Sequence, residues 1–171
     1  MAELVDIFDV DWNPTGEVMD KAEALRLGKY HKVVVLWIVN SHGEVLLQKR
    51  SMGKRLRPGM LDVSVSGHVG AGETGIDCIV REAREELSID INPKDLIAVG
   101  RASTVAPYLV EGFVLRGDFA ISDFVFDGNE VAEVKFVPWR ELAAMGPDEL
   151  QANNIVNLAP WHLLFDYMEN S

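Results

Sequence analysis

The sequence predicts an α/β fold, in which a mixed β-sheet is covered by helices as in an α/β/α sandwich. Two observations indicate this class. Segments rich in β-branched and apolar residues lie both before and after one long central helix, an order typical of a sheet with helical layers. The chain has 171 residues, 48% of them hydrophobic, which suits one compact core. We therefore expect a single domain over residues 1–171 with a short N-terminal hairpin extension.

The charge and the cysteine usage narrow the class of protein. A formal net charge of −11 disfavours a general basic surface for DNA or RNA. Cys78 is the only cysteine, so an internal disulfide is excluded and a reducing compartment is indicated. The first residues lack the pattern of a signal peptide, and no apolar run has the length of a membrane span. We expect a cytoplasmic protein that binds neither nucleic acid nor a membrane.

The N-terminal elements follow from alternation and turn residues. The turn signal at 13–16 joins two short alternating segments and predicts a hairpin. Asp20 is suited to cap a short helix that ends at Gly28. A β-branched run and a second strand flank the turn at 40–43. The expected elements are hairpin strands at 4–10 and 17–19, a helix at 21–27, and strands at 32–40 and 44–49.

The rest of the chain is predicted from the same rules. A strand at 61–65 leads directly into a glycine-rich loop, and Thr74 and Asp77 have the spacing of a cap for the central helix. Prolines mark the starts of the later helices. The expected later elements are strands at 96–104, 109–119 and 131–137, a helix from about 138 that includes Glu141 and Leu142, a segment at 147–151, and a helix at 160–168.

The central helix carries a cluster of glutamates on one face. Glu82, Glu85 and Glu86 stand at i, i+3 and i+4, so they project from the same side, where like charges repel. A hard divalent cation with oxygen ligands relieves this repulsion, and Mg²⁺ is the usual choice. The residues expected on the opposite, apolar face are Ile76, Val80, Ala83 and Leu87.

Together, the glycine-rich loop and the glutamate helix resemble the Nudix box. The residues in register with that pattern are Gly67, Glu73, Arg81, Glu82, Glu85, Glu86 and Ile89. Two positions depart from it. Ser88 stands where the family has glycine, which implies some strain at a left-handed helix end, and Ala83 is small for an aliphatic position. The resemblance implies a Nudix-type α/β/α sandwich.

Further similarity points to a branch of the family that contains isopentenyl-diphosphate isomerases and isomerase-like hydrolases. The segments that carry it are 14–17, His31, 37–40, 46–51 and 58–68. The isomerases have a catalytic cysteine where this chain has Ser66, and a hydroxyl is a far weaker acid than a thiol. His31 and His68 match two metal-binding histidines of the isomerases, but a third is absent. With the glutamate pattern intact, these differences favour hydrolysis.

The resemblance implies roles for individual residues. Glu82, Glu85 and Glu86 would hold Mg²⁺, or alternatively Mn²⁺, with the Gly67 carbonyl as a further ligand, and Glu82 would also serve as the base. Arg81 would pair with Glu73 and hold the loop to the helix. A later carboxylate often completes the metal site in this family, and the sequence leaves Glu111 and Glu130 as alternatives.

The substrate expected from the resemblance is a small-molecule diphosphate, such as a nucleoside-diphosphate-linked compound. The residues expected to contact it are Lys49, Arg50, Lys54, Arg57 and His68, although solvated surface charge is the default explanation for the basic loop at 50–59. His31 is expected to be structural. The alternatives to a hydrolase are an isopentenyl-diphosphate isomerase and a non-catalytic nucleotide-binding module. Family members are often dimeric, so a homodimer is a further expectation.

Overall fold

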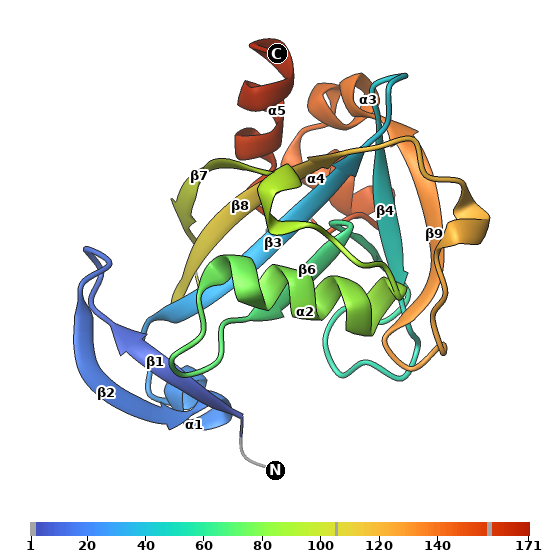
Figure 1. Ribbon diagram of the computed structural model, residues 1–171. Helices are drawn as coiled ribbons and strands as arrows, with labels where there is room; N and C mark the ends of the chain where they lie inside the picture. Colours follow the sequence, from blue (N-terminus) through green and yellow to red (C-terminus); the bar gives the residue numbers. More distant parts are fainter. Residues whose placement is uncertain (1–2, 105, 157–158) are drawn as a thin grey trace.

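The computed structural model describes residues 3–104, 106–156 and 159–171. Its main sheet is mixed, and Figure 1 shows that β3 runs through its middle. β3 pairs with β8 in parallel, whereas every other pairing in this sheet is antiparallel. The strands of the sheet are β3 (His31–Val39), β4 (Glu44–Arg50), β5 (Leu61–Asp62), β6 (Val65–His68), β7 (Leu96–Ser103), β8 (Tyr108–Arg116) and β9 (Val131–Pro138).

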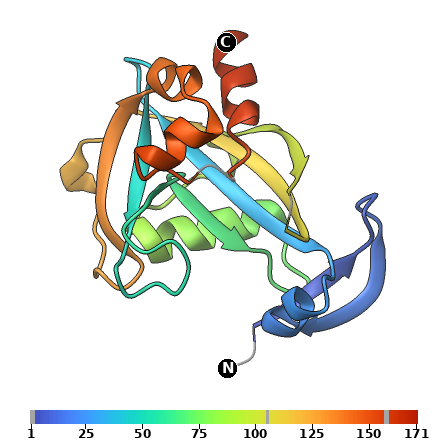
Figure 2. The ribbon, with the colours of Figure 1, turned by 180° about the vertical axis from the view of Figure 1, so that it is seen from behind.

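Helices cover both faces of the sheet, which confirms the predicted α/β/α sandwich. Figures 1 and 2 show α2 (Gly75–Leu87) on one face and α3 (Trp139–Ala144), α4 (Pro147–Ala152) and α5 (Trp161–Glu169) on the other. Val34, Leu36 and Ile38 of β3 belong to the core under α2, whereas the alternate residue Trp37 belongs to the core under the C-terminal helices. β3 is therefore apolar from Val33 to Val39, because both of its faces are buried there.

The segment predicted as one strand at 61–65 is two strands. β5 pairs with β4, and β6 pairs with β3 and continues to His68. Ser64 lies at the break, fully buried. Its hydroxyl accepts a hydrogen bond from the backbone of Ile38 at 2.8 Å and donates one to the carbonyl of Leu46 at 2.6 Å. The side chain thus bridges β3 and β4 at the point where the segment stops pairing with β4 and begins to pair with β3.

The helix α2 has the predicted caps and a slightly different buried face. Thr74 accepts a hydrogen bond from the backbone of Asp77, and Ser88 ends the helix in the left-handed conformation with φ 56°. Ile76 was expected in the core but is 41% exposed, whereas Ile79 is fully buried. Ile76 lies in the first turn, where it lines a surface depression together with residues of β7 and β8, so periodicity alone misplaced it.

The N-terminal segment forms a separate two-stranded sheet that lies against the glycine loop (Figure 1). It comprises β1 (Leu4–Phe8), β2 (Pro14–Asp20) and α1 (Lys21–Arg26), which Asp20 caps as predicted. The chain reverses at Asp9, whose carboxylate accepts hydrogen bonds from the backbones of Asp11 and Asn13. The turn is thus earlier than the predicted 13–16, which lies almost entirely in β2. No described helix is long and apolar enough to cross a membrane.

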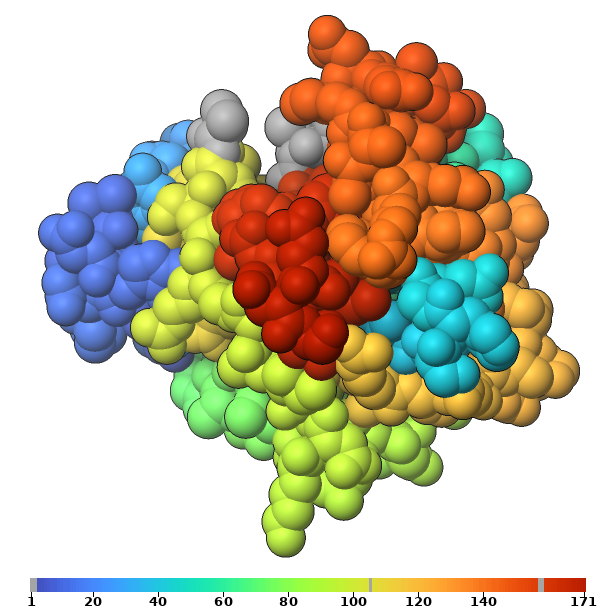
Figure 3. All heavy atoms as spheres, turned by 90° about the horizontal axis from the view of Figure 1, so that it is seen from above, coloured from blue at the N-terminus to red at the C-terminus, as the bar shows by residue number. Residues whose placement is uncertain are grey.

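Contacts with the glycine loop position this hairpin beside the central helix. The backbone of Ala71 donates to the carbonyl of Leu4 at 2.9 Å, and the backbone of Gly72 donates to the Asp6 carboxylate at 2.8 Å. Gly72 has φ 76°, a conformation that favours glycine. In the view from above in Figure 3, the hairpin forms one flank of the molecule and the C-terminal helices lie over the centre.

Candidate active site

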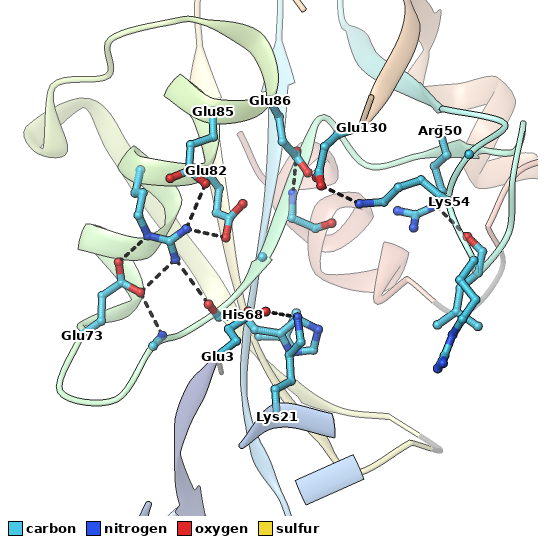
Figure 4. Close-up of a pocket in the computed structure, with 18 residues that line it drawn as sticks. Glu3, Lys21, Arg50, Lys54, His68, Glu73, Glu82, Glu85, Glu86 and Glu130 are labelled. Atoms are coloured by element: carbon cyan, nitrogen blue, oxygen red, sulfur yellow. Dashed lines mark hydrogen bonds and ion pairs between the residues drawn. The ribbon is translucent and has the colours of Figure 1, made fainter. Parts of the chain in front are cut away.

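A cavity of about 790 Å³ lies between α2, the basic loop after β4 and the N-terminal hairpin. Figure 4 shows the glutamates of α2 on one side of it, Arg50 and Lys54 on another, and His68 with Lys21 and Glu3 below. The lining includes nearly all of the polar side chains that the Nudix-like pattern singles out. The charged and histidine residues that line it are Glu3, Lys21, Arg50, Lys54, Arg55, His68, Glu73, Arg81, Glu82, Glu85, Glu86 and Glu130.

The three clustered glutamates differ in burial. Glu85 is 58% exposed, whereas the side chain of Glu82 is only 13% exposed and Glu86 is 7% exposed. Burial, followed by the charge of Glu82, raises the pKa of Glu86 from 4.5 to about 8. Glu86 accepts hydrogen bonds from the Gln48 amide at 3.0 Å and from the backbone of Ser66 at 3.3 Å. Burial also raises the pKa of Glu82.

Arg81 joins the loop to the helix. Its guanidinium donates two hydrogen bonds to Glu73, at 2.9 and 3.0 Å, in the bidentate geometry that makes such pairs strong. The same group donates to Glu82 at 2.8 Å and to Glu85 at 3.3 Å. These hydrogen bonds from Arg81 lower the pKa of Glu73 and raise the pKa of the guanidinium itself. The structure therefore contains the Arg81–Glu73 pair expected from the sequence.

Gly67 is the point of closest approach between β6 and α2. A Cβ atom at this position would lie 2.2 Å from the carboxyl group of Glu82, so any larger side chain would displace it. Glycine is required here because only a residue without a side chain leaves space for the Glu82 side chain to lie across β6. The predicted role of the Gly67 carbonyl as a metal ligand stays a prediction.

The structure distinguishes the two candidates for an additional carboxylate. Glu130 lines the cavity with the α2 glutamates, and its charge contributes to the raised pKa of Glu82 and of Glu86. Glu111 instead forms ion pairs with Lys32 and Arg101, at 3.5 and 3.3 Å, in a different depression near the first turn of α2. The structure does not bring Glu111 to the glutamate cluster.

The predicted basic residues separate into three groups. Arg50 and Lys54 line the cavity, and Lys54 forms an ion pair with Glu130 at 2.8 Å. Lys49 does not line it and pairs with Glu133 on the surface at 3.5 Å, because alternate residues of β4 point to opposite faces. Arg57 lines a second cavity that adjoins the first.

Lys21 and Glu3 were not predicted to be site residues. They form an ion pair with each other at the edge of the cavity, where the hairpin meets the glycine loop (Figure 4). No spacing in the sequence connects them with the glutamate helix, which begins more than fifty positions after Lys21. Only the docking of the hairpin brings them together.

The rings of His31, which is buried, and His68, which is half-buried, stack on each other, and Tyr108 contacts both edge-on. Nε2 of His31 lies 3.1 Å from Nδ1 of His68, and Nδ1 of His31 lies 3.2 Å from the carbonyl of Lys29. His31 is fully buried. Burial lowers the pKa of His31 and lowers that of His68 to about 3, so both rings are neutral at physiological pH.

The donor set of the cavity fits a hard divalent cation. Glu82, Glu85, Glu86 and Glu130 supply only carboxylate oxygens, the ligands that Mg²⁺ and Mn²⁺ prefer. In the described part of the chain, no group of three His, Cys, Asp or Glu side chains is already arranged as a metal site. Arg81 contacts two of these glutamates. A bound cation would therefore take over part of the neutralisation of these carboxylates that Arg81 now provides.

Comparison with known proteins agrees with this geometry. The model of the NUDIX domain matches residues 29–159. The chain belongs to the Nudix hydrolase family. A Nudix hydrolase of Deinococcus radiodurans is 38% identical over 160 residues, which cover 91% of each chain. A crystal structure from the same organism superposes with a TM-score of 0.74 at 27% identity, over 90% of this chain and 92% of that one.

As a Nudix hydrolase, the protein is a pyrophosphohydrolase, and the family does not specify the substrate. The similarity to isomerases is narrower. An isopentenyl-diphosphate Delta-isomerase of Escherichia coli is 30% identical over 95 residues, which cover 56% of this chain and 52% of that protein. That overlap agrees with the branch resemblance read from the upstream segments, but it leaves nearly half of each chain unmatched.

Proposed function

We propose that this Nudix hydrolase uses Mg²⁺ to cleave the pyrophosphate linkage of a small-molecule diphosphate, such as a nucleoside-diphosphate-linked compound. The observation that carries the proposal is the convergence of four carboxylates, from α2 and from the segment before β9, opposite Arg50 and Lys54 in one cavity. Carboxylates on one side suit a divalent cation, and cations on the other suit phosphate oxygens. The carboxylates and the basic side chains are both required to hold two phosphates beside a metal ion.

The chain supplies binding, orientation and a proton acceptor. Mg²⁺, when bound by the glutamates, would neutralise phosphate charge and favour ionisation of a water. Arg50 and Lys54 would bind the phosphate oxygens, and Lys54 would exchange its contact with Glu130 for the substrate. Water oxygen attacks one phosphorus, the bond from that phosphorus to the bridging oxygen breaks, and the second phosphate leaves with the bridging oxygen.

We assign Glu82 as the group that accepts the proton of the attacking water. Its pKa is raised by burial, which makes it a better base near neutral pH than an exposed carboxylate. Arg81 holds it by a hydrogen bond of 2.8 Å, and Gly67 leaves room for it over β6. Glu85 and Glu86, with Glu130, would then be the principal metal ligands. Lys21 is a further candidate to contact a phosphate.

The proposal also covers the organisation of the protein. Residues 1–171 act as one unit in which the hairpin contributes Lys21 and Glu3 to the cavity. A cytoplasmic location and a homodimer, both inferred from the sequence and the family resemblance, remain part of the proposal.

A screen of diphosphate compounds with Mg²⁺, in which products are identified by mass, tests the function. We expect release of phosphate-containing products from at least one compound, and no release in the presence of EDTA. The matched control is Glu133→Gln, because Glu133 is exposed and, among the described residues, its ion pair is with Lys49 on the surface. Turnover that persists without a divalent cation would contradict the proposal, and so would binding without turnover across the screen, which would favour the non-catalytic alternative.

Isomerisation of isopentenyl diphosphate is the second candidate, since part of the chain resembles an isomerase. The site lacks the thiol of that reaction, because Ser66 occupies its position. The histidines His31 and His68 are hydrogen-bonded to each other. We expect no deuterium uptake from heavy water into isopentenyl diphosphate with Mg²⁺ present, and none after Ser66→Cys. Clear incorporation by the unmodified protein would favour the isomerase.

A further inference from the structure

A second cavity, of about 440 Å³, adjoins the proposed catalytic cavity. Val33, Arg50, Leu56, Ser66 and His68 line both, so the two form a continuous space. Most of the other described residues of its wall are aliphatic: Val35, Val63, Val110, Val156, Ala106, Ala159 and Pro160. A diphosphate held by the glutamates and the basic loop therefore has room for its non-phosphate group on the far side of His68.

The hydrogen bonds of the histidine pair fix the proton positions on both rings. The Lys29 carbonyl can only accept, so Nδ1 of His31 carries the proton. His31 is fully buried, and in the described part of the chain its ring nitrogens contact that carbonyl and His68. The charge of Glu3 favours a second proton, but Lys21 opposes it and burial disfavours the charged ring, so His31 carries one proton. Nε2 of His31 is therefore the acceptor, and Nδ1 of His68 must donate to it at 3.1 Å.

One unprotonated nitrogen remains at the end of this chain of hydrogen bonds. With its proton on Nδ1, neutral His68 has a free lone pair on Nε2. In the described part of the chain, Nε2 of His68 has no hydrogen-bond partner, although the ring lines both cavities. Figure 4 shows the ring below the glutamate cluster, beside Lys21.

We propose that His68 is a specificity-determining residue whose Nε2 accepts a hydrogen bond from the non-phosphate group of the substrate, while His31 positions the proton that makes it an acceptor. This inference rests on the proposed diphosphate substrate and narrows its class. The favoured compounds carry a hydroxyl or N–H group close to the diphosphate, as the ribose of a nucleoside diphosphate does. A hydrocarbon diphosphate leaves Nε2 desolvated and unpaired, which opposes its binding.

Nitrogen-15 NMR of the histidine side chains tests the relay in the free protein. The chain has four histidines, and substitution of His42, which is exposed and lines neither cavity, leaves three imidazoles to assign. We expect the Nδ1–H tautomer on both His31 and His68. In His31→Met, His68 loses its acceptor and should show a changed tautomer. An Nε2–H tautomer of His68 in the wild-type protein overturns the proposal, and this result does not depend on whether the protein hydrolyses any compound.

Binding of a non-hydrolysable nucleotide tests the acceptor role. With Mg²⁺ present, α,β-methylene-ADP should shift the Nε2 resonance of His68 in the direction expected for an accepted hydrogen bond. His31→Met should weaken the affinity for this probe about tenfold but leave the affinity for inorganic pyrophosphate unchanged, because pyrophosphate has no non-phosphate group. Absence of the shift at saturation, failure of the probe to bind, or equal weakening for both probes overturns the proposal.

Discussion

Substitution of Glu86 by glutamine should raise the stability of the metal-free protein while it abolishes turnover. Glu86 is 7% exposed, and burial together with the charge of Glu82 raises its pKa from 4.5 to about 8. A raised carboxyl pKa means that the folded state holds the proton more tightly than the unfolded chain. The stability of the wild-type protein therefore falls as the pH rises from about 4.5 to about 8, and this contribution stays lost above that range.

The magnitude follows from the two pKa values. At about 1.4 kcal/mol per pKa unit, the penalty above pH 8 is roughly 5 kcal/mol as an upper bound. Relaxation of the site and entry of water reduce it, so we expect a measured gain of about 1–3 kcal/mol for Glu86→Gln at pH 9. Glutamine has the same shape and can still accept the hydrogen bond from Ser66.

Urea unfolding in EDTA at pH 5.5 and at pH 9 measures this effect. The advantage of Glu86→Gln over the wild-type protein should be small at pH 5.5, where the folded wild type is protonated at this site, and should grow by pH 9. Added Mg²⁺ should reverse the order, because the wild-type protein gains binding free energy that the variant lacks. A stability difference independent of pH, or wild-type turnover of the variant at saturating Mg²⁺, would refute the reasoning. Glu133→Gln is the exposed control, which should match the wild type at both pH values.

Three further predictions concern the supports of the site. Arg81→Ala should lower both turnover and Mg²⁺ affinity, and the double variant with Glu73→Gln should be little worse in a double-mutant cycle, whereas additive losses would show independent roles. Gly67→Ala should cost about 1–3 kcal/mol of stability in urea unfolding and displace the glutamate packed on it; an unchanged midpoint and turnover would refute the close approach. Glu130→Gln should weaken Mg²⁺ affinity about tenfold in titration calorimetry, while Glu111→Gln should not, and the opposite order would reverse the assignment.

The sequence predicted best what depends on local spacing. The shared face of Glu82, Glu85 and Glu86 follows from the helical period, and the resemblance to the Nudix box implied the pairing of Arg81 with Glu73. The structure contains both. Periodicity failed at Ile76 in the first turn of the helix, where a depression beside β7 and β8 leaves the side chain exposed.

Features that depend on the docking of distant elements were beyond reach of the sequence. The sequence left Glu111 and Glu130 as alternatives for the additional carboxylate. In the structure, the segment before β9 brings Glu130 into the cavity with the α2 glutamates. Glu111 lies on β8 and pairs with Arg101 of the neighbouring strand β7, away from them. Lys21 reaches the cavity through hairpin contacts with the glycine loop. The break between β5 and β6 at Ser64 could not be predicted either, because it depends on hydrogen bonds between Ser64 and two other strands, β3 and β4.

Hydrolysis of the best diphosphate compound in water enriched with oxygen-18, with mass analysis of both products, tests the central claim most directly. The account predicts that, with Mg²⁺ present, one of the two phosphate-containing products gains a single heavy oxygen per turnover, and that Glu85→Gln loses nearly all of this turnover while it remains folded. Turnover of Glu85→Gln equal to that of the wild-type protein, or products without heavy oxygen, would contradict it.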